Sequence, residues 1–154
     1  MDSGFDSPVE PMKQTTAAAF AALARGLLSP LAGAGELADA TVAKALGVSG
    51  VTHTTKANSR RGMTYSDLSY QDGQGSALFV LRLGTADQYS LWKQAMGTES
   101  TPVAGVGLEA FQVKTFRAVC AKSTSSAVCV TPSFVNKNLK ISDVQIQALV
   151  SAAL

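Results

Sequence analysis

Apolar residues recur at helical spacing in four segments of the chain. The last two segments each open on a capping box, formed by Thr85 with Gln88 and by Ser142 with Gln145. Gly47, which follows the second segment, is typical of a helix C-terminus. The predicted helices cover residues 16–28, 36–46, 85–96 and 142–154.

Between these segments the pattern is β-rich and broken by turn residues. Two runs flank Asp72-Gly73, a dipeptide that strongly favours a hairpin turn. Leu78, Phe79, Val80 and Leu81 place bulk on both sides of the second run, which predicts a central strand in a sheet covered on both faces. The predicted strands cover residues 51–55, 63–70, 76–83, 108–116, 117–122 and 126–131, with loops at 56–62 and 98–107.

This order of elements predicts an α+β fold, in which helices pack on an antiparallel sheet. A chain of 154 residues is long enough for one domain with its own core. Residues 1–14 contain Pro, Gly and Ser without periodicity, so we expect a flexible lead-in followed by a single domain over 15–154. Residues 15–35 fit either a helix of that domain or the remnant of a targeting signal beginning at Met12.

Composition narrows the class of partner. Charged residues make up only 16% of the chain and the net charge is +2, while Ser, Thr, Ala and Gly are abundant. There is no basic stripe interleaved with aromatic residues, so nucleic-acid binding has no electrostatic signature here. A neutral, hydroxyl-rich surface favours an exported protein.

The two cysteines could form a disulfide, a metal site or a redox pair, or remain reduced. Their C-x8-C spacing fits neither a zinc site nor a C-x-x-C redox motif. Symmetric pairing of residues 117–122 with 126–131 sets Cys120 opposite Cys129, within disulfide range and on the more polar face. We therefore favour a cross-strand disulfide and an oxidising compartment. A one-residue slip of the register would instead place the cysteines on opposite faces.

Short motifs resemble a family of small secreted lipoproteins of actinobacteria. They are "ELADATVAKALG", the following strand pair, "LWKQ" and "PVAGVGLEAF", within residues 36–154. The resemblance implies a PsbP-like sandwich outside the cytoplasm. The chain departs from the pattern at Leu108, where an acidic residue is usual, and lacks the lipid-attachment cysteine. Any membrane contact would then run through an N-terminal tether that this chain does not include.

Candidate catalytic chemistry is sparse, and we assign no catalytic residue, metal ligand or cofactor. His53 is the single histidine, so a serine hydrolase would have to use it as the base. We expect instead an ordinary, half-exposed strand residue. Asp67 and Asp72 are the best-placed carboxylates for acid–base work, although Asp72 also suits the turn.

Two sets of residues could bind a partner. The basic residues Lys56, Arg60 and Arg61 could contact an anion or another protein. The second set is aromatic and could hold a small apolar ligand between sheet and helices: Tyr65, Phe79, Tyr89 and Trp92. We therefore expect a non-enzymatic, extracytoplasmic binding or interaction module, secreted, periplasmic or at the cell surface. The alternatives are an apolar-ligand carrier and a small hydrolase using His53.

Overall fold

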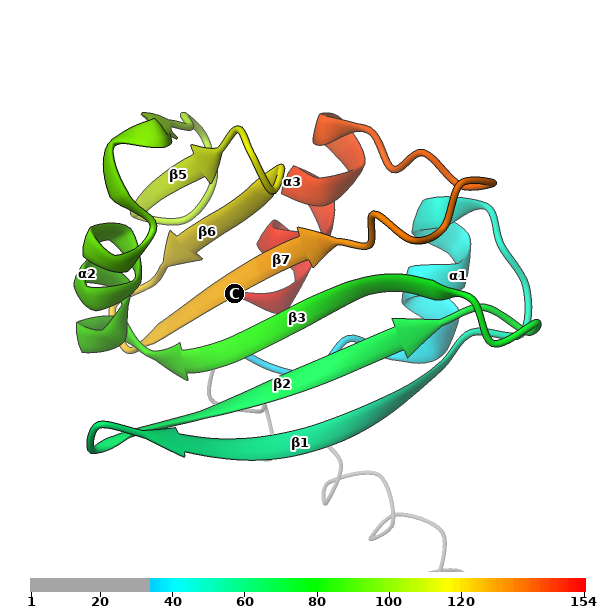
Figure 1. Ribbon diagram of the computed structural model, residues 1–154, viewed down its shortest axis with the longest axis horizontal. Coiled ribbons are helices and arrows are strands. Elements are labelled where there is room, and N and C mark those ends of the chain that lie inside the picture. The colour runs from blue at the N-terminus through cyan, green and yellow to red at the C-terminus, as the bar shows by residue number, and fades with distance from the viewer. Residues whose placement is uncertain (1–33) are drawn as a thin grey trace, which may run out of the picture. The chain divides into compact units, whose positions relative to one another are not determined.

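A computed structural model of the chain describes residues 34–154. Over this range it has one antiparallel sheet with the strand order β1-β2-β3-β7-β6-β5-β4 and three α-helices (Figure 1). This confirms the predicted α+β class. The helices are α1 (Asp39–Leu46), α2 (Ala86–Ala95) and α3 (Asp143–Ala153), with a short 3-10 helix η1 (Gly97–Glu99). The strands are β1 (Thr52–Arg60), β2 (Met63–Gln71), β3 (Ala77–Thr85), β4 (Ser100–Pro102), β5 (Glu109–Val113), β6 (Ala118–Lys122) and β7 (Ser126–Pro132).

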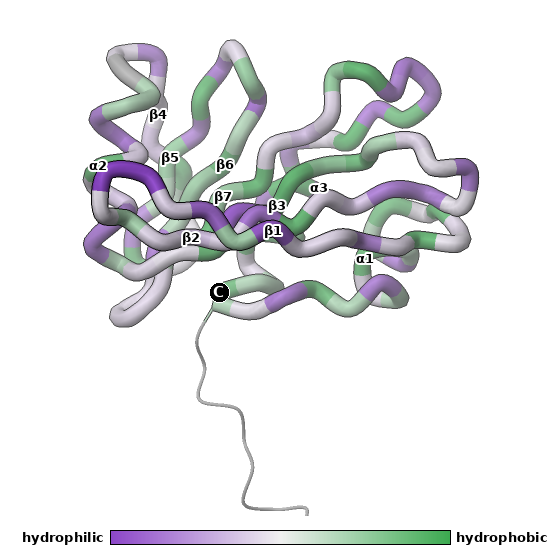
Figure 2. The backbone as a smooth tube through the Cα atoms, turned by 60° about the horizontal axis from the view of Figure 1, so that its bottom comes forward, coloured by the Kyte–Doolittle hydropathy of each residue, from purple (hydrophilic) through white to green (hydrophobic). Residues whose placement is uncertain are grey.

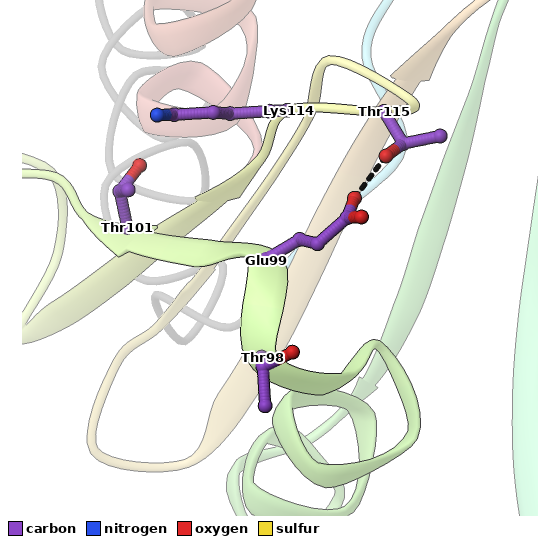
Figure 3. Close-up of a pocket in the computed structure, with 5 residues that line it drawn as sticks. All are labelled: Thr98, Glu99, Thr101, Lys114 and Thr115. Atoms are coloured by element: carbon purple, nitrogen blue, oxygen red, sulfur yellow. Dashed lines mark hydrogen bonds between the residues drawn. The ribbon is translucent and has the colours of Figure 1, made fainter.

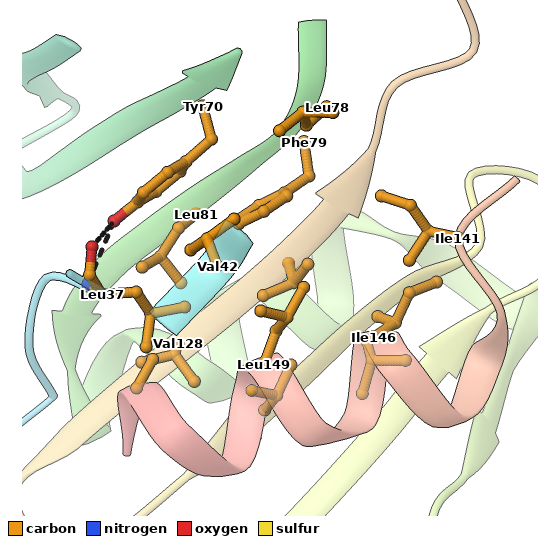
Figure 4. Close-up of a cluster of buried hydrophobic side chains, with 14 of the residues drawn as sticks. Leu37, Val42, Tyr70, Leu78, Phe79, Leu81, Val128, Ile141, Ile146 and Leu149 are labelled. Atoms are coloured by element: carbon orange, nitrogen blue, oxygen red, sulfur yellow. Dashed lines mark hydrogen bonds between the residues drawn. The ribbon is translucent and has the colours of Figure 1, made fainter. Parts of the chain in front are cut away.

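Helices cover both faces of the sheet. The face covered by α1 and α3, called here the α1/α3 face, carries the larger core (Figure 4). Helix α3 presents an apolar stripe to this core, and every member of the stripe is buried: Ile146, Leu149, Val150 and Ala153. The opposite face, called the α2 face, carries a second core around Tyr89, Trp92 and Phe111. Strand β3 is paired on both sides, as a central strand should be, but its buried apolar side chains Leu78, Phe79 and Leu81 all belong to the α1/α3 core, and Gly84 is the residue that faces α2.

Helix α2 lies close to the sheet because a glycine faces it. A Cβ atom at Gly84 would lie 2.8 Å from the ring of Trp92 and would also collide with Gln88. Gln88 is buried, and its side chain donates to the carbonyl of Thr64 on β2 at 2.9 Å. The same side chain completes the predicted capping box with Thr85, so one residue both starts the helix and ties it to the sheet.

Most predicted elements are confirmed, including the hairpin of β2 and β3, the pairing of β6 with β7, and both capping boxes. In the β2–β3 hairpin, Asp72 Oδ1 accepts from the backbone N–H groups of Gln74 and Ser76, at 2.9 Å each. Gly47 ends α1 in the left-handed conformation, with φ of 67°. The helix predicted over residues 16–28 and the lead-in over 1–14 lie outside the described residues.

The prediction of a loop over residues 56–62 is wrong. Strand β1 continues through Arg60 and turns into β2 over Arg61 and Gly62, whose φ values are 53° and 79°. Positive φ at both central residues is the mark of a two-residue hairpin turn. The structure also differs from the prediction over residues 98–107. The predicted loop there includes the end of η1 and the edge strand β4.

The cysteines lie on the predicted face of the sheet, opposite the larger core, but this face is also covered. Cys120 and Cys129 are both almost fully buried, because α2 covers their face of the sheet. The strand sequences alone show Lys122 and Thr131 on that face, and the apolar cover comes from a helix elsewhere in the chain. Val119, Ala121, Val128 and Val130 do form the predicted core on the opposite face.

Candidate functional site

The single histidine lies between two carboxylates. His53 Nδ1 is 2.6 Å from Asp39 Oδ1, and its Nε2 is 2.8 Å from Glu36 Oε1. The carboxylates come from the first turn of α1 and the residues before it, whereas His53 lies on β1. Its ring also stacks on Tyr70 of β2, with the centroids 4.9 Å apart. Both ring nitrogens therefore face carboxylates, and neither is directed at a serine hydroxyl.

The two carboxylates stabilise the charged imidazolium. The hydrogen bond to Asp39 is the main cause that raises the pKa of His53 above 6.5, and the charges of Asp39 and Glu36 add to it, while burial opposes the shift. The neighbouring Tyr70 hydroxyl stays neutral, because burial raises its pKa to about 12. A doubly protonated ring can donate to both carboxylates at once, so His53 connects β1 to the start of α1. The two contacts of His53, with Asp39 and Glu36, are called the His53 clasp below.

We expect this clasp to weaken as pH rises. Because the pKa of His53 is higher in the folded than in the unfolded state, its stabilisation is complete below the unfolded value of about 6.5 and is lost as pH rises through the folded value. An NMR titration of the ring should place its pKa above 6.5, without ambiguity because the chain has one histidine. Asp39→Asn should lower that pKa.

The matched control is Asp87→Asn, which removes an exposed carboxylate in the first turn of α2. This variant should leave the His53 titration unchanged. A wild-type pKa at or below 6.5, or equal responses to both substitutions, would contradict the clasp.

The predicted basic residues gather at one edge of the sheet. Lys56 and Arg60 lie on β1, and Arg61 occupies the hairpin turn beside them. All three are exposed. Within residues 34–154, none of them forms an ion pair with a described carboxylate. Figure 2 shows β1 on the side toward the viewer, coloured largely white to purple.

Asp67, directly opposite Lys56 on β2, is already neutralised by another cation. Arg82 of β3 makes two hydrogen bonds to its carboxylate, at 2.8 and 3.0 Å, and Asn58 adds a third at 3.1 Å. The guanidinium also lies over the ring of Tyr65, 4.4 Å from its centroid. Asp67 is thus held by a polar network of three strands rather than paired with Asp72. The sequence analysis did not identify Arg82 as the partner of Asp67.

The four aromatic residues proposed for an apolar ligand do not line one cavity. Phe79 stacks on Tyr70 within the α1/α3 core, at 4.7 Å between centroids. Tyr89 and Trp92 belong to the α2 core on the other side of the sheet, and burial raises the pKa of Tyr89 to about 12. Tyr65 lies under Arg82. The sheet itself separates Phe79 from Tyr89 and Trp92.

Two described cavities are open to solvent and are lined by a mixture of polar and apolar surface. One of about 560 Å³ is lined by residues of η1, β4 and the turn between β5 and β6: Thr98, Glu99, Thr101, Lys114 and Thr115. In it the Thr115 hydroxyl donates to Glu99, and Figure 3 shows the Lys114 ammonium directed away from that carboxylate. A second of about 550 Å³ lies beside residues 135–138. Neither cavity is lined by any of the four aromatic residues proposed for an apolar ligand.

The two cysteines form the disulfide expected from the symmetric pairing of their strands. Cys120 and Cys129 are direct partners in the β6–β7 pairing and are joined through their sulfur atoms. The predicted register is therefore confirmed. The bond lies beneath α2, with Cys120 Sγ 4.0 Å from Met96 Sδ.

The described residues contain neither a metal centre nor a membrane-spanning helix. In the part of the chain that the structure describes, no group of three or more His, Cys, Asp or Glu side chains is arranged so that it could hold a metal ion. None of the helices in that part is long and apolar enough to cross a bilayer. Comparison of the chain with protein-family models, with curated proteins and with solved structures gives no match.

Proposed function

We propose that the protein is a non-enzymatic, extracytoplasmic interaction module that binds its partner along β1. The observation that carries the proposal is the open edge of the sheet. Strand β1 is nine residues long, nearly all of its side chains are exposed, and it pairs only with β2 among the described strands. Exposed sheet edges that are long and regular are templates for pairing with another chain.

The other edge of the sheet offers no comparable surface. Strand β4 has three residues and ends on Pro102, which has no N–H group to donate. The basic residues Lys56, Arg60 and Arg61 all belong to the β1 edge and its turn. The binding edge is thus distinguished by both length and charge.

We propose an extracytoplasmic location as part of the same function. The Cys120–Cys129 disulfide supports an oxidising setting, because such bonds are rare in reducing cytosol. A sheet with helices on both faces is also compatible with the PsbP-like sandwich implied by the resemblance to secreted lipoproteins. Secretion, a periplasmic location and attachment to the cell surface all fit the disulfide.

Site-specific photo-crosslinking in cells that naturally produce the protein tests the proposal. A photoreactive residue would replace Thr54, which is exposed on β1, and in a matched variant Val144, which is 76% exposed on α3. We expect a defined adduct from position 54 alone, in the envelope or culture fraction, with the partner identified by mass spectrometry. No adduct, equal adducts at both positions, or an adduct in the cytoplasmic fraction would overturn it.

A further inference from the structure

The backbone of β1 presents a regular row of hydrogen-bonding groups to the outside. In a two-residue hairpin the residues that flank the turn form a hydrogen-bonded pair, which here is Arg60 with Met63. Pairs alternate along an antiparallel ladder, so the backbone groups of every second residue point away from β2. The residues with outward groups are His53, Thr55, Ala57 and Ser59.

The charge at this edge selects among possible partners. No acidic residue occurs from Thr52 to Ser66, whereas Lys56, Arg60 and Arg61 all lie there. Asp67, the nearest carboxylate across the ladder from Lys56, is committed to Arg82 and so leaves the charge of Lys56 available.

A second copy of the chain fits this edge poorly. Antiparallel addition of another β1 centred on Lys56 would place the two lysines directly opposite one another. Like charges in that position destabilise a strand pair, and lysine on an edge strand is a common device against self-association. An acidic strand would reverse the sign of this interaction.

The side chains of β1 also specify a pattern for the added strand. Lys56 and Arg60 project on the α2 face, four residues apart, so acidic residues at the same spacing would lie beside them. Thr55, Ala57 and Ser59 project on the other face and are small and exposed. That side leaves room for larger, β-branched neighbours. The favoured segment therefore alternates acidic and β-branched residues.

We propose that β1 binds an extended acidic segment of a partner protein, which joins the sheet as an added strand beside β1. The inference rests on the proposed function and names the class of partner for the same edge. Main-chain hydrogen bonds to the outward groups supply affinity in this mode, and alternate side chains supply specificity. Lys56 and Arg60 would attract the acidic positions and raise the rate of association at low ionic strength.

A capped nine-residue peptide that alternates glutamate and valine serves as the probe. We expect it to bind the full chain, with affinity that falls as salt is added. Lys56→Glu should weaken binding by about tenfold, because an attraction becomes a repulsion. A block peptide of identical composition and a lysine–valine peptide should bind far more weakly. Equal binding of either control peptide, or no binding of the probe at low salt, would overturn the inference.

A substitution that alters the backbone of β1 distinguishes strand addition from simple charge attraction. Ala57→Pro removes one outward N–H group, and proline is tolerated on edge strands when that group faces solvent. We expect this variant to lose at least tenfold in affinity, whereas Ala57→Ser should bind as wild type. In the wild-type protein, hydrogen exchange at the Thr55 and Ala57 amides should slow when the peptide is added. Unchanged exchange would overturn strand addition even if Ala57→Pro failed to fold.

Other possible occupants of the β1 edge would give different results in these experiments. If the protein alone dimerises in sedimentation experiments and Ala57→Pro abolishes the dimer, a second copy occupies β1 and the inference fails. If the crosslink at position 54 appears but the acidic peptide does not bind, the interaction module stands and its partner is not an acidic strand. Failure of the crosslink together with tight, register-dependent peptide binding would instead remove the proposed cellular role.

Discussion

Replacing Tyr70 with phenylalanine should destabilise the domain by about 2–4 kcal/mol, because it leaves two buried backbone groups without partners. The Tyr70 hydroxyl donates to the Leu37 carbonyl at 2.8 Å and accepts from the Leu37 N–H at 3.0 Å (Figure 4). Both residues are buried. The segment before α1 has no strand partner there, so this one side chain satisfies both of the Leu37 backbone groups.

Chemical unfolding monitored by circular dichroism measures the loss. The matched control is Tyr65→Phe, since the Tyr65 hydroxyl makes no hydrogen bond within residues 34–154 and its ring is half-buried under Arg82. That variant should stay within about 0.5 kcal/mol of wild type. Hydrogen exchange at Leu37 should accelerate only in Tyr70→Phe. Equal destabilisation by the two substitutions would contradict this account of Tyr70.

Local signals in the sequence predicted the elements whose cause is local. The capping boxes at Thr85 and Ser142 fix where α2 and α3 begin, because the residues involved are three apart. The pairing of Cys120 with Cys129 followed from symmetric alignment of two adjacent strands. In each of these cases the interacting residues are close neighbours along the chain.

Strand β1 was only partly predicted, because its environment removes the usual signal. Alternation between apolar and polar residues arises when one side of a strand is buried. Nearly every side chain from Thr52 to Arg60 is exposed on both faces, so the run shows no alternation and resembles a loop. The turn that ends it uses Arg61 at positive φ, where Asn or Asp is the familiar choice. An open edge strand is thus hard to recognise from sequence, because exposure on both faces removes the alternation.

The candidate site depended on contacts between distant elements. Glu36 and Asp39 sit three residues apart at the start of a helix, which is an ordinary place for acidic residues. Nothing local indicates that His53 lies between them, since that contact requires α1 to pack against β1. Likewise, the cover that α2 places over the cysteines depends on which face of the sheet the helix crosses.

Loss of the disulfide should have the other large effect on stability. The bond joins residues nine apart in sequence, and a loop of that size corresponds to about 2.5 kcal/mol in the chain-entropy model. Reduced wild-type protein should lose about this amount, because it keeps both sulfur atoms in the core. The variant Cys120→Ala with Cys129→Ala should lose more, because the buried space around Phe111 and Met96 would also be less well filled.

Unfolding in guanidinium, with and without reductant, separates these two contributions. The wild type should unfold at lower denaturant concentration when reduced, whereas the double variant should be insensitive to reductant. Thiol titration of the unfolded wild type without reductant should find no free thiol. Two free thiols, or identical unfolding of wild type in both conditions, would contradict a stabilising disulfide.

Because Cys120 and Cys129 lie beneath α2, reductant should reach them slowly in the folded protein and quickly once the helix separates from the sheet.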